Sequence, residues 1–124
     1  MANVIGLDHV TIIVKDAQAS LAFYQSLLGV DILERPDLAF PGFWIDLHAG
    51  QSLHIMQLAN PNESTTRPEH GGQDFHFALR VDSVEPFVKK LNTMGRAFTK
   101  STSGRNALFV RDLDENAFEL FESL

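Results

Sequence analysis

The sequence contains no cysteine, only one tryptophan and one tyrosine, and no apolar run approaching the roughly 20 residues of a membrane-spanning helix. Without cysteine the chain forms neither disulfides nor thiolate zinc sites, and it fits a reducing compartment. The N-terminal stretch MANVIGLDHV also lacks the basic and long apolar segments of a secretory signal. We therefore expect a cytoplasmic protein that does not enter a membrane.

Positive charge is also scarce. Ten Lys and Arg face sixteen Asp and Glu, which gives a formal net charge of −6, and the only basic doublet is Lys89-Lys90. This balance argues against nucleic acid or an anionic membrane surface as a partner. The length of 124 residues and the 44% of hydrophobic residues fit a single globular domain spanning 1–124. We expect its partner to be a small molecule.

The order strand, helix, strand, strand, strand is predicted twice along the chain. In the first half Asp16 is placed to cap the helix and Gly29 to end it. In the second half Asp82 or Ser83 is the expected cap, and Gly95 follows the helix. The expected strands are 10–14, 30–34, 43–47 and 52–58, then 75–81, 96–100, 107–111 and 117–121, with helices at 17–28 and from the cap to Met94. Module one thus covers 4–58, the polar segment 59–72 is a linker, and module two covers 73–124.

The two modules place polar residues at equivalent positions. His9 and His76 open the first strands at a separation of 67 residues, and His54 and Glu119 lie in the last strands at a separation of 65. A lone histidine on an apolar strand is usually not a metal ligand, but four candidates at symmetric positions favour one metal site. Imidazole and carboxylate ligands suit Zn, Ni, Fe, Mn or Co. We therefore predict a single divalent-metal site built from these four residues.

Strand parity and the repeat suggest which side chains line a substrate pocket beside that site. Thr11 follows His9 on one face of its strand, and Arg80 lies on the same face as His76. Arg80 either binds an anionic substrate group or extends to solvent at the sheet edge. Trp44 and Phe109 occupy equivalent positions and either form walls of the pocket or pack in the core.

Several motifs together resemble the vicinal-oxygen-chelate superfamily. This superfamily includes glyoxalase I, fosfomycin-resistance enzymes, bleomycin-binding proteins, methylmalonyl-CoA epimerase and extradiol dioxygenases. The motifs are Leu7-Asp8-His9-Val10, Phe23-Tyr24, Leu28-Gly29, His76-Phe77-Ala78 and the run from Asp112 to Leu120. The resemblance implies an α+β fold in which two βαβββ modules form a curved, open mixed sheet.

The same resemblance implies a homodimer whose metal sites are shared between subunits. One chain would contribute His9 and His54, and the other would contribute His76 and Glu119. Of these, His9, His76 and Glu119 match the three-ligand pattern of the superfamily. His54 stands where glyoxalase I enzymes typically place a glutamate. The turn Asp112-Leu113-Asp114-Glu115-Asn116 also replaces the usual Asp-Pro-Asp-Gly-Asn, so we expect the left-handed residue to be Asn116.

The leading functional hypothesis is a metal-dependent lyase or isomerase resembling glyoxalase I. It would act on a small oxygen-rich substrate that chelates the metal through vicinal oxygens, with Glu119 and then His54 as candidate proton-transfer residues. One alternative is a non-heme iron ring-cleaving dioxygenase, because two histidines and a carboxylate form the facial iron site. Another is a resistance protein of the bleomycin-binding kind that sequesters a small molecule. A further one is a thiol-transferring resistance enzyme, in which the loop 101–106 either binds a cation or a phosphonate or is an ordinary hairpin turn.

Overall fold

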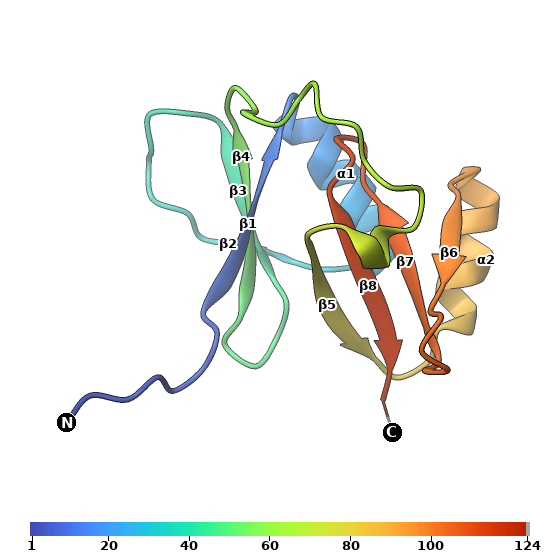
Figure 1. The fold of residues 1–124 in the computed structure, drawn as a ribbon. Helices are drawn as coiled ribbons and strands as arrows, with labels where there is room; N and C mark the ends of the chain where they lie inside the picture. The colour runs from blue at the N-terminus through green and yellow to red at the C-terminus, as the bar shows by residue number, and fades with distance from the viewer. Residues whose placement is uncertain (124) are drawn as a thin grey trace.

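The computed structural model describes residues 1–123, so Leu124, the last residue of the predicted second module, lies outside the described part. Two four-stranded sheets and two helices form the framework of this chain (Figure 1). The elements of the first half are β1 (His9–Val14), α1 (Ala17–Leu28), β2 (Ile32–Leu33), β3 (Gly42–Asp46) and β4 (Ser52–Gln57). Those of the second half are β5 (His76–Val81), α2 (Glu85–Met94), β6 (Phe98–Lys100), β7 (Ala107–Arg111) and β8 (Ala117–Glu122), preceded by a short 3₁₀ helix, η1 (Gly71–Gln73).

Both sheets have the same topology. The first has the strand order β1-β4-β3-β2 and the second the order β5-β8-β7-β6. In each sheet the first and last strands of the module pair in parallel, and the remaining pairs are antiparallel. The prediction of an α+β fold with two βαβββ modules and open mixed sheets is confirmed.

The ends of the first helix follow the predicted capping. Asp16 accepts a hydrogen bond from the backbone N–H of Ala19 at 3.1 Å, and Gly29 ends the helix with a φ of 64°. The second helix differs, because neither Asp82 nor Ser83 caps it. Its N-cap residue is Val84, whose N–H donates to Glu122 Oε1 at 3.0 Å, so β8 supplies a carboxylate at this helix N-terminus.

Two strands are shorter than predicted, and each has a local reason. The segment 30–34 pairs only at Ile32 and Leu33, which form an edge strand that stops before Arg35-Pro36. The segment 96–100 begins pairing only at Phe98, because the Arg96 N–H still closes the preceding helix by donating to Leu91 O at 2.9 Å.

Helix α1 joins the two sheets through the core. It packs on β3 and β4, and its Phe23 and Tyr24 rings lie against Phe118 of β8 at centroid distances of 6.4 and 5.5 Å. Leu27 on the same helix is fully buried. Since successive side chains of a strand point to opposite faces, the residues that alternate with the core residues lie on the other face of each sheet. We call these the outer faces, and they carry the predicted site residues.

The turn before β8 corrects one prediction. The left-handed residue is Glu115, with a φ of 68°, and not Asn116. Asn116 instead donates from its backbone N–H to Asp112 Oδ1 at 2.9 Å, and from its side-chain amide to Asp112 Oδ2 at 3.0 Å and Ile13 O at 3.2 Å. These bonds fix Asn116. The left-handed conformation therefore falls on Glu115, at the position where the family usually has glycine.

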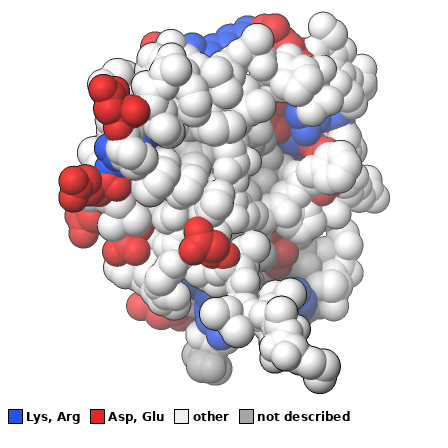
Figure 2. All heavy atoms as spheres, turned by 90° about the vertical axis from the view of Figure 1, so that its left-hand side faces the viewer, with Lys and Arg blue, Asp and Glu red and all other residues white. Residues whose placement is uncertain are grey.

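Charge is distributed unevenly over the side of the molecule shown in Figure 2. Acidic side chains gather along one edge of this view, and much of the remaining surface is uncharged. Within residues 1–123, no helix is both long and apolar enough to cross a membrane.

Candidate metal centre

The outer face of the first sheet carries an aromatic stack. The rings of His9 on β1 and His54 on β4 lie parallel, with centroids 3.9 Å apart. Trp44 on β3 covers the opposite side of His54, with a centroid distance of 4.2 Å and an interplanar angle of 3°. Trp44 is therefore a wall of this face and not a core residue.

His9 is oriented by its neighbour. Its Nδ1 lies 2.7 Å from Asp8 Oδ2. A carboxylate can only accept a hydrogen bond, so the neutral ring carries its proton on Nδ1 and keeps a lone pair on Nε2. Metal-binding histidines commonly have this arrangement, in which a carboxylate or carbonyl holds the nitrogen that does not bind the ion. The sequence does not indicate this pairing, because adjacent side chains on a strand are expected to point to opposite faces.

His54 is held differently. Its Nε2 lies 3.0 Å from Ser52 Oγ, and burial together with the neighbouring His9 lowers its pKa. Two imidazoles that bind one ion must point their lone pairs at a common centre, which parallel stacked rings do not do. The assignment of His54 as a fourth ligand remains a prediction, and it requires this ring to rotate.

The outer face of the second sheet holds the other pair. His76 Nε2 lies 3.8 Å from Glu119 Oε1, and the Glu119 side chain is buried. The Nδ1 of His76 lies 2.9 Å from the backbone oxygen of Asp74, so the neutral ring is protonated there. The free Nε2 and the carboxylate oxygen are separated by a distance that can accommodate an ion about 2.1 Å from each.

Two further side chains border this second pair. The edge of the Phe109 ring packs against His76 at a centroid distance of 5.1 Å. Arg105 lies over the Phe121 ring, 3.7 Å from its centroid, and its Nη1 is 4.0 Å from Glu119 Oε2. The two oxygens of Glu119 therefore face different partners, the histidine on one side and the guanidinium on the other. Sequence reasoning did not single out Arg105.

One chain does not bring all four predicted ligands together. Among residues 1–123, no three His, Asp or Glu side chains are grouped so that they could hold an ion. The four residues form two pairs on the outer faces of two different sheets. In each pair one histidine is already oriented, His9 by Asp8 and His76 by the Asp74 carbonyl. The free ring nitrogens and the carboxylate oxygens of the two pairs form a donor set that fits a divalent ion.

The predicted pocket residues are distributed over several hollows. Thr11 shares a hollow of about 360 Å³ with His76, between the edges of β1 and β5. Trp44 borders an open hollow with His9 and His54. Arg80 is exposed and borders a separate hollow that includes His48.

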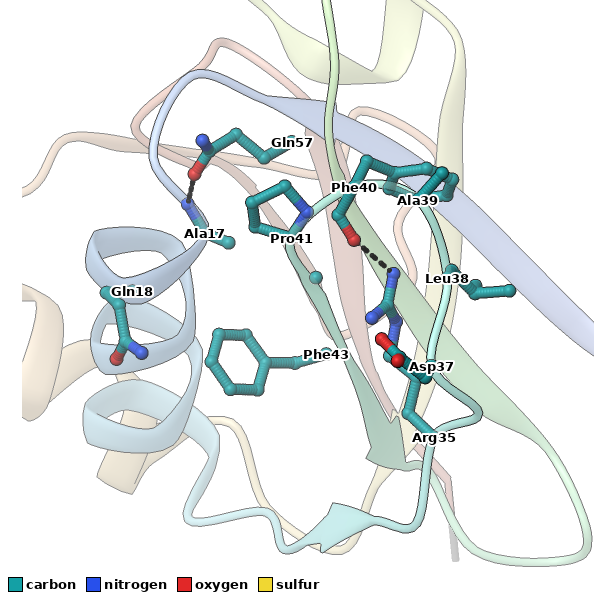
Figure 3. Close-up of a pocket in the computed structure, with 11 residues that line it drawn as sticks. Ala17, Gln18, Arg35, Asp37, Leu38, Ala39, Phe40, Pro41, Phe43 and Gln57 are labelled. Atoms are coloured by element: carbon teal, nitrogen blue, oxygen red, sulfur yellow. Dashed lines mark hydrogen bonds between the residues drawn. The ribbon is translucent and has the colours of Figure 1, made fainter.

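Another hollow, of about 470 Å³, lies beside the N-terminal end of α1 (Figure 3). Arg35 lines it and donates to Phe40 O at 2.9 Å, and the Ala17 N–H donates to Gln57 Oε1 at 2.9 Å. None of the predicted metal ligands lines this hollow.

Comparison with known proteins agrees with this architecture. The sequence profile of the Glyoxalase/Bleomycin resistance protein/Dioxygenase superfamily matches residues 6–120. Glyoxylase I 4 of Arabidopsis thaliana is 27% identical over 108 residues, which are 86% of this chain and 62% of that protein. YwkD of Bacillus subtilis strain 168 is 28% identical over 123 residues, which cover 94% of this chain and 95% of that protein. The chain thus spans less than two thirds of the plant relative.

Solved structures support the same fold. A glyoxalase family protein from Bacillus anthracis has a TM-score of 0.80 at 23% identity, with all of both chains covered. The fosfomycin resistance protein FosX of Listeria monocytogenes has a TM-score of 0.76 at 22% identity, covering 98% of this chain and 94% of that one. An E126Q mutant of that FosX, complexed with Mn(II) and 1S,2S-dihydroxypropylphosphonic acid, has a TM-score of 0.71 at 19% identity, with 98% and 95% covered. At these identities the likeness concerns the fold alone.

Proposed function

Because the chain belongs to the Glyoxalase/Bleomycin resistance protein/Dioxygenase superfamily, we propose that it is a divalent-metal-dependent enzyme of the glyoxalase-I-like lyase or isomerase class. Its substrate would be a small molecule that offers two adjacent oxygens. The core ligands are His9, His76 and Glu119.

The observation that carries this proposal is the pair formed by His76 and Glu119. A buried carboxylate faces the unprotonated nitrogen of an imidazole whose other nitrogen is held by a backbone carbonyl. Burying a carboxylate without a full partner is costly, and the nearest positively charged group, the Arg105 guanidinium, stands 4.0 Å away. A bound cation would give this buried group the partner it lacks.

We further propose that two copies of the chain share each site. The two half-sites lie on different sheets of one chain, and three ligands do not converge within residues 1–123. A second copy can bring His9 of one subunit to the His76 and Glu119 half-site of the other. The site would then form only in a homodimer.

The residues of the site have separate roles in this scheme. A bound divalent ion would polarise the substrate oxygens and stabilise an enediolate. Glu119 Oε2, which faces away from His76, is placed to take up a proton and return it. His54 is the second candidate for this role, because Ser52 Oγ orients its Nε2 and its lowered pKa keeps the ring neutral at neutral pH.

The stack of His54 on Trp44 and His9 favours a second candidate function. With His54 held in the stack, two histidines and one carboxylate remain, which is the ligand set of non-heme iron(II) oxygenases. A ring-cleaving dioxygenase is therefore the alternative. Isomerisation of a hemithioacetal without oxygen uptake would support the lyase, and oxygen consumption with catechols under iron(II) would replace it with the dioxygenase.

Metal content provides the first test. Protein purified without added metal is analysed by elemental analysis for wild type, His9→Ala and Glu119→Ala. We expect a divalent metal in the wild type and its loss in both variants. Unchanged metal content in both would contradict the proposed site.

Mixing the two variants then tests whether the site is shared. A heterodimer of His9→Ala and Glu119→Ala chains contains one site with both defects and one with neither, if sites span the subunits. Mixed and refolded chains should therefore regain metal, up to one ion per heterodimer. If each site belonged to a single chain, mixing would restore nothing.

A further inference from the structure

The orientation of His76 depends on a single backbone oxygen. The Nδ1 of this ring donates to Asp74 O at 2.9 Å, which leaves the Nε2 lone pair facing Glu119. A carbonyl can only accept, so any displacement of residue 74 would release the ring to the other tautomer. What holds the backbone of residue 74 therefore also holds the half-site.

Asp74 is fixed by its own carboxylate. Oδ1 accepts the N–H of Phe75 at 2.8 Å, and Oδ2 accepts from Arg111 at 2.8 Å and Arg67 at 3.0 Å. The side chain is 9% exposed, and the two arginine side chains are 14% and 18% exposed. Charge-assisted hydrogen bonds are strong and directional, and solvent screens them little at this burial.

Arg111 extends the same network to the strand that carries Glu119. Its Nη2 donates to Pro68 O at 2.6 Å, and its Nη1 donates to Glu115 O at 2.8 Å. Pro68 belongs to the segment before β5, and Glu115 to the turn before β8. One guanidinium thus ties together the two segments that lead into His76 and Glu119.

We propose that Asp74, Arg67 and Arg111, here called the Asp74 clamp, are positioning residues that fix the tautomer and direction of His76 for metal binding. This inference rests on the proposed metal site. The clamp acts through the Asp74 carbonyl and does not itself touch the ion.

The first module shows that the fold does not require such a clamp. The residue at the Asp74 position is Leu7, and the register partner that corresponds to Arg111 is Asp46. The first sheet nevertheless has the same topology. A buried ion-pair network that appears in only one of two equivalent modules therefore serves something other than the βαβββ fold. Its contact with His76, through the carbonyl of Asp74, indicates that this role is to orient the histidine.

The test compares Asp74→Asn with wild type in two measurements. Zinc(II) binding by isothermal titration should weaken about 10- to 100-fold, the range for losing a partner that orients a ligand. In the metal-free protein, long-range ¹H–¹⁵N correlation spectra should show His76 protonated on Nδ1 in wild type and a mixture of tautomers in the variant. Tyr24→Phe, which removes a buried hydrogen bond elsewhere, is the matched control and should change neither measurement.

Each outcome decides whether the Asp74 clamp positions His76. Zinc affinity within about twofold of wild type, with a single His76 tautomer, would overturn it. If Asp74→Asn does not fold, Arg67→Gln removes one donor only and should weaken zinc binding about 10-fold; no change would likewise overturn the clamp. If wild type binds no zinc, the proposed function fails, and the tautomer spectra of the metal-free protein still decide whether the clamp orients His76.

Discussion

The two modules have the same strand order but treat their half-sites in opposite ways. In the first, His9 is oriented by Asp8, whose side chain is 86% exposed, and the neighbouring position holds a stacked imidazole. In the second, His76 is oriented by a carbonyl that buried ion pairs hold, and the neighbouring position holds a buried carboxylate. A repeated backbone therefore fixes where the candidate ligands stand, while unrepeated side chains decide how rigid and how charged each half-site is.

The largest expected contrast between the modules is at the equivalent positions 54 and 119. We expect the His54→Ala variant to retain its metal, because the stacked His54 ring does not point its lone pair at the same centre as His9. The Glu119→Ala variant, in contrast, should lose its metal. Metal content after dialysis, compared at equal protein concentration, measures this. Loss of metal from His54→Ala to the level of Glu119→Ala would show that His54 rotates out of the stack and makes the two modules equivalent.

A smaller effect is expected where the modules meet, at the only tyrosine. Burial and the nearby Asp112 raise the pKa of Tyr24 well above 10.0, and its hydroxyl donates to Asp112 Oδ2 at 2.7 Å. We expect Tyr24→Phe to reduce the free energy of unfolding by about 1–3 kcal/mol, since Asp112 loses a donor in a buried place. Urea unfolding at neutral pH measures this difference.

The pH dependence of the same pair has a definite sign. The folded protein keeps the Tyr24 proton to a higher pH than the unfolded chain does. Its stabilising contribution is therefore complete below pH 10 and is lost as the pH rises above that value. The difference between wild type and Tyr24→Phe should shrink in that range, and tyrosinate absorbance should rise only as the protein unfolds. Ionisation near pH 10 in the folded protein would contradict the burial of this hydroxyl.

The smallest effect is expected at the turn before β8. Glu115 has a φ of 68°, which is unfavourable for a residue with a Cβ atom. Glu115→Gly should raise the free energy of unfolding by about 0.5–1 kcal/mol, because the strain it relieves exceeds the added chain entropy. Thermal unfolding measures this, with Glu63→Gln, at an exposed ion pair with Lys15, as a control for lost charge. The Glu115 carboxylate also lies 3.9 Å from Arg111 Nε. A destabilised Glu115→Gly would mean that this ion pair stabilises the protein by more than the strained turn costs.

Much of the fold could be read from the sequence, because it depends on local patterns. Apolar runs located the long strands, and Asp16 and Gly29 marked the helix they bound. The repeat placed His9 opposite His76 and His54 opposite Glu119 because strand parity puts equivalent residues on equivalent faces. Localisation, assembly and metal identity stay predictions.

What the sequence could not show depends on contacts between distant segments. Nothing in the spacing of Arg67, Asp74 and Arg111 indicates that they meet, and the composition of the polar segment 59–72 predicts only a linker. The structure adds that His70 within this segment contacts the second sheet, with its Nδ1 2.6 Å from Thr99 Oγ1. The stack of His54 on Trp44 depends on side-chain rotamers, which residue order does not specify.

The parallel pairing of first and last strands has a consequence for folding. His9 and His54 are separated by most of a module, as are His76 and Glu119, yet each pair shares adjacent strands. Contacts between residues distant in sequence form late, because the intervening chain must first be ordered. Each half-site therefore exists only once its module has closed, so an ion that needs these residues binds the native chain and shifts the equilibrium away from partly folded forms.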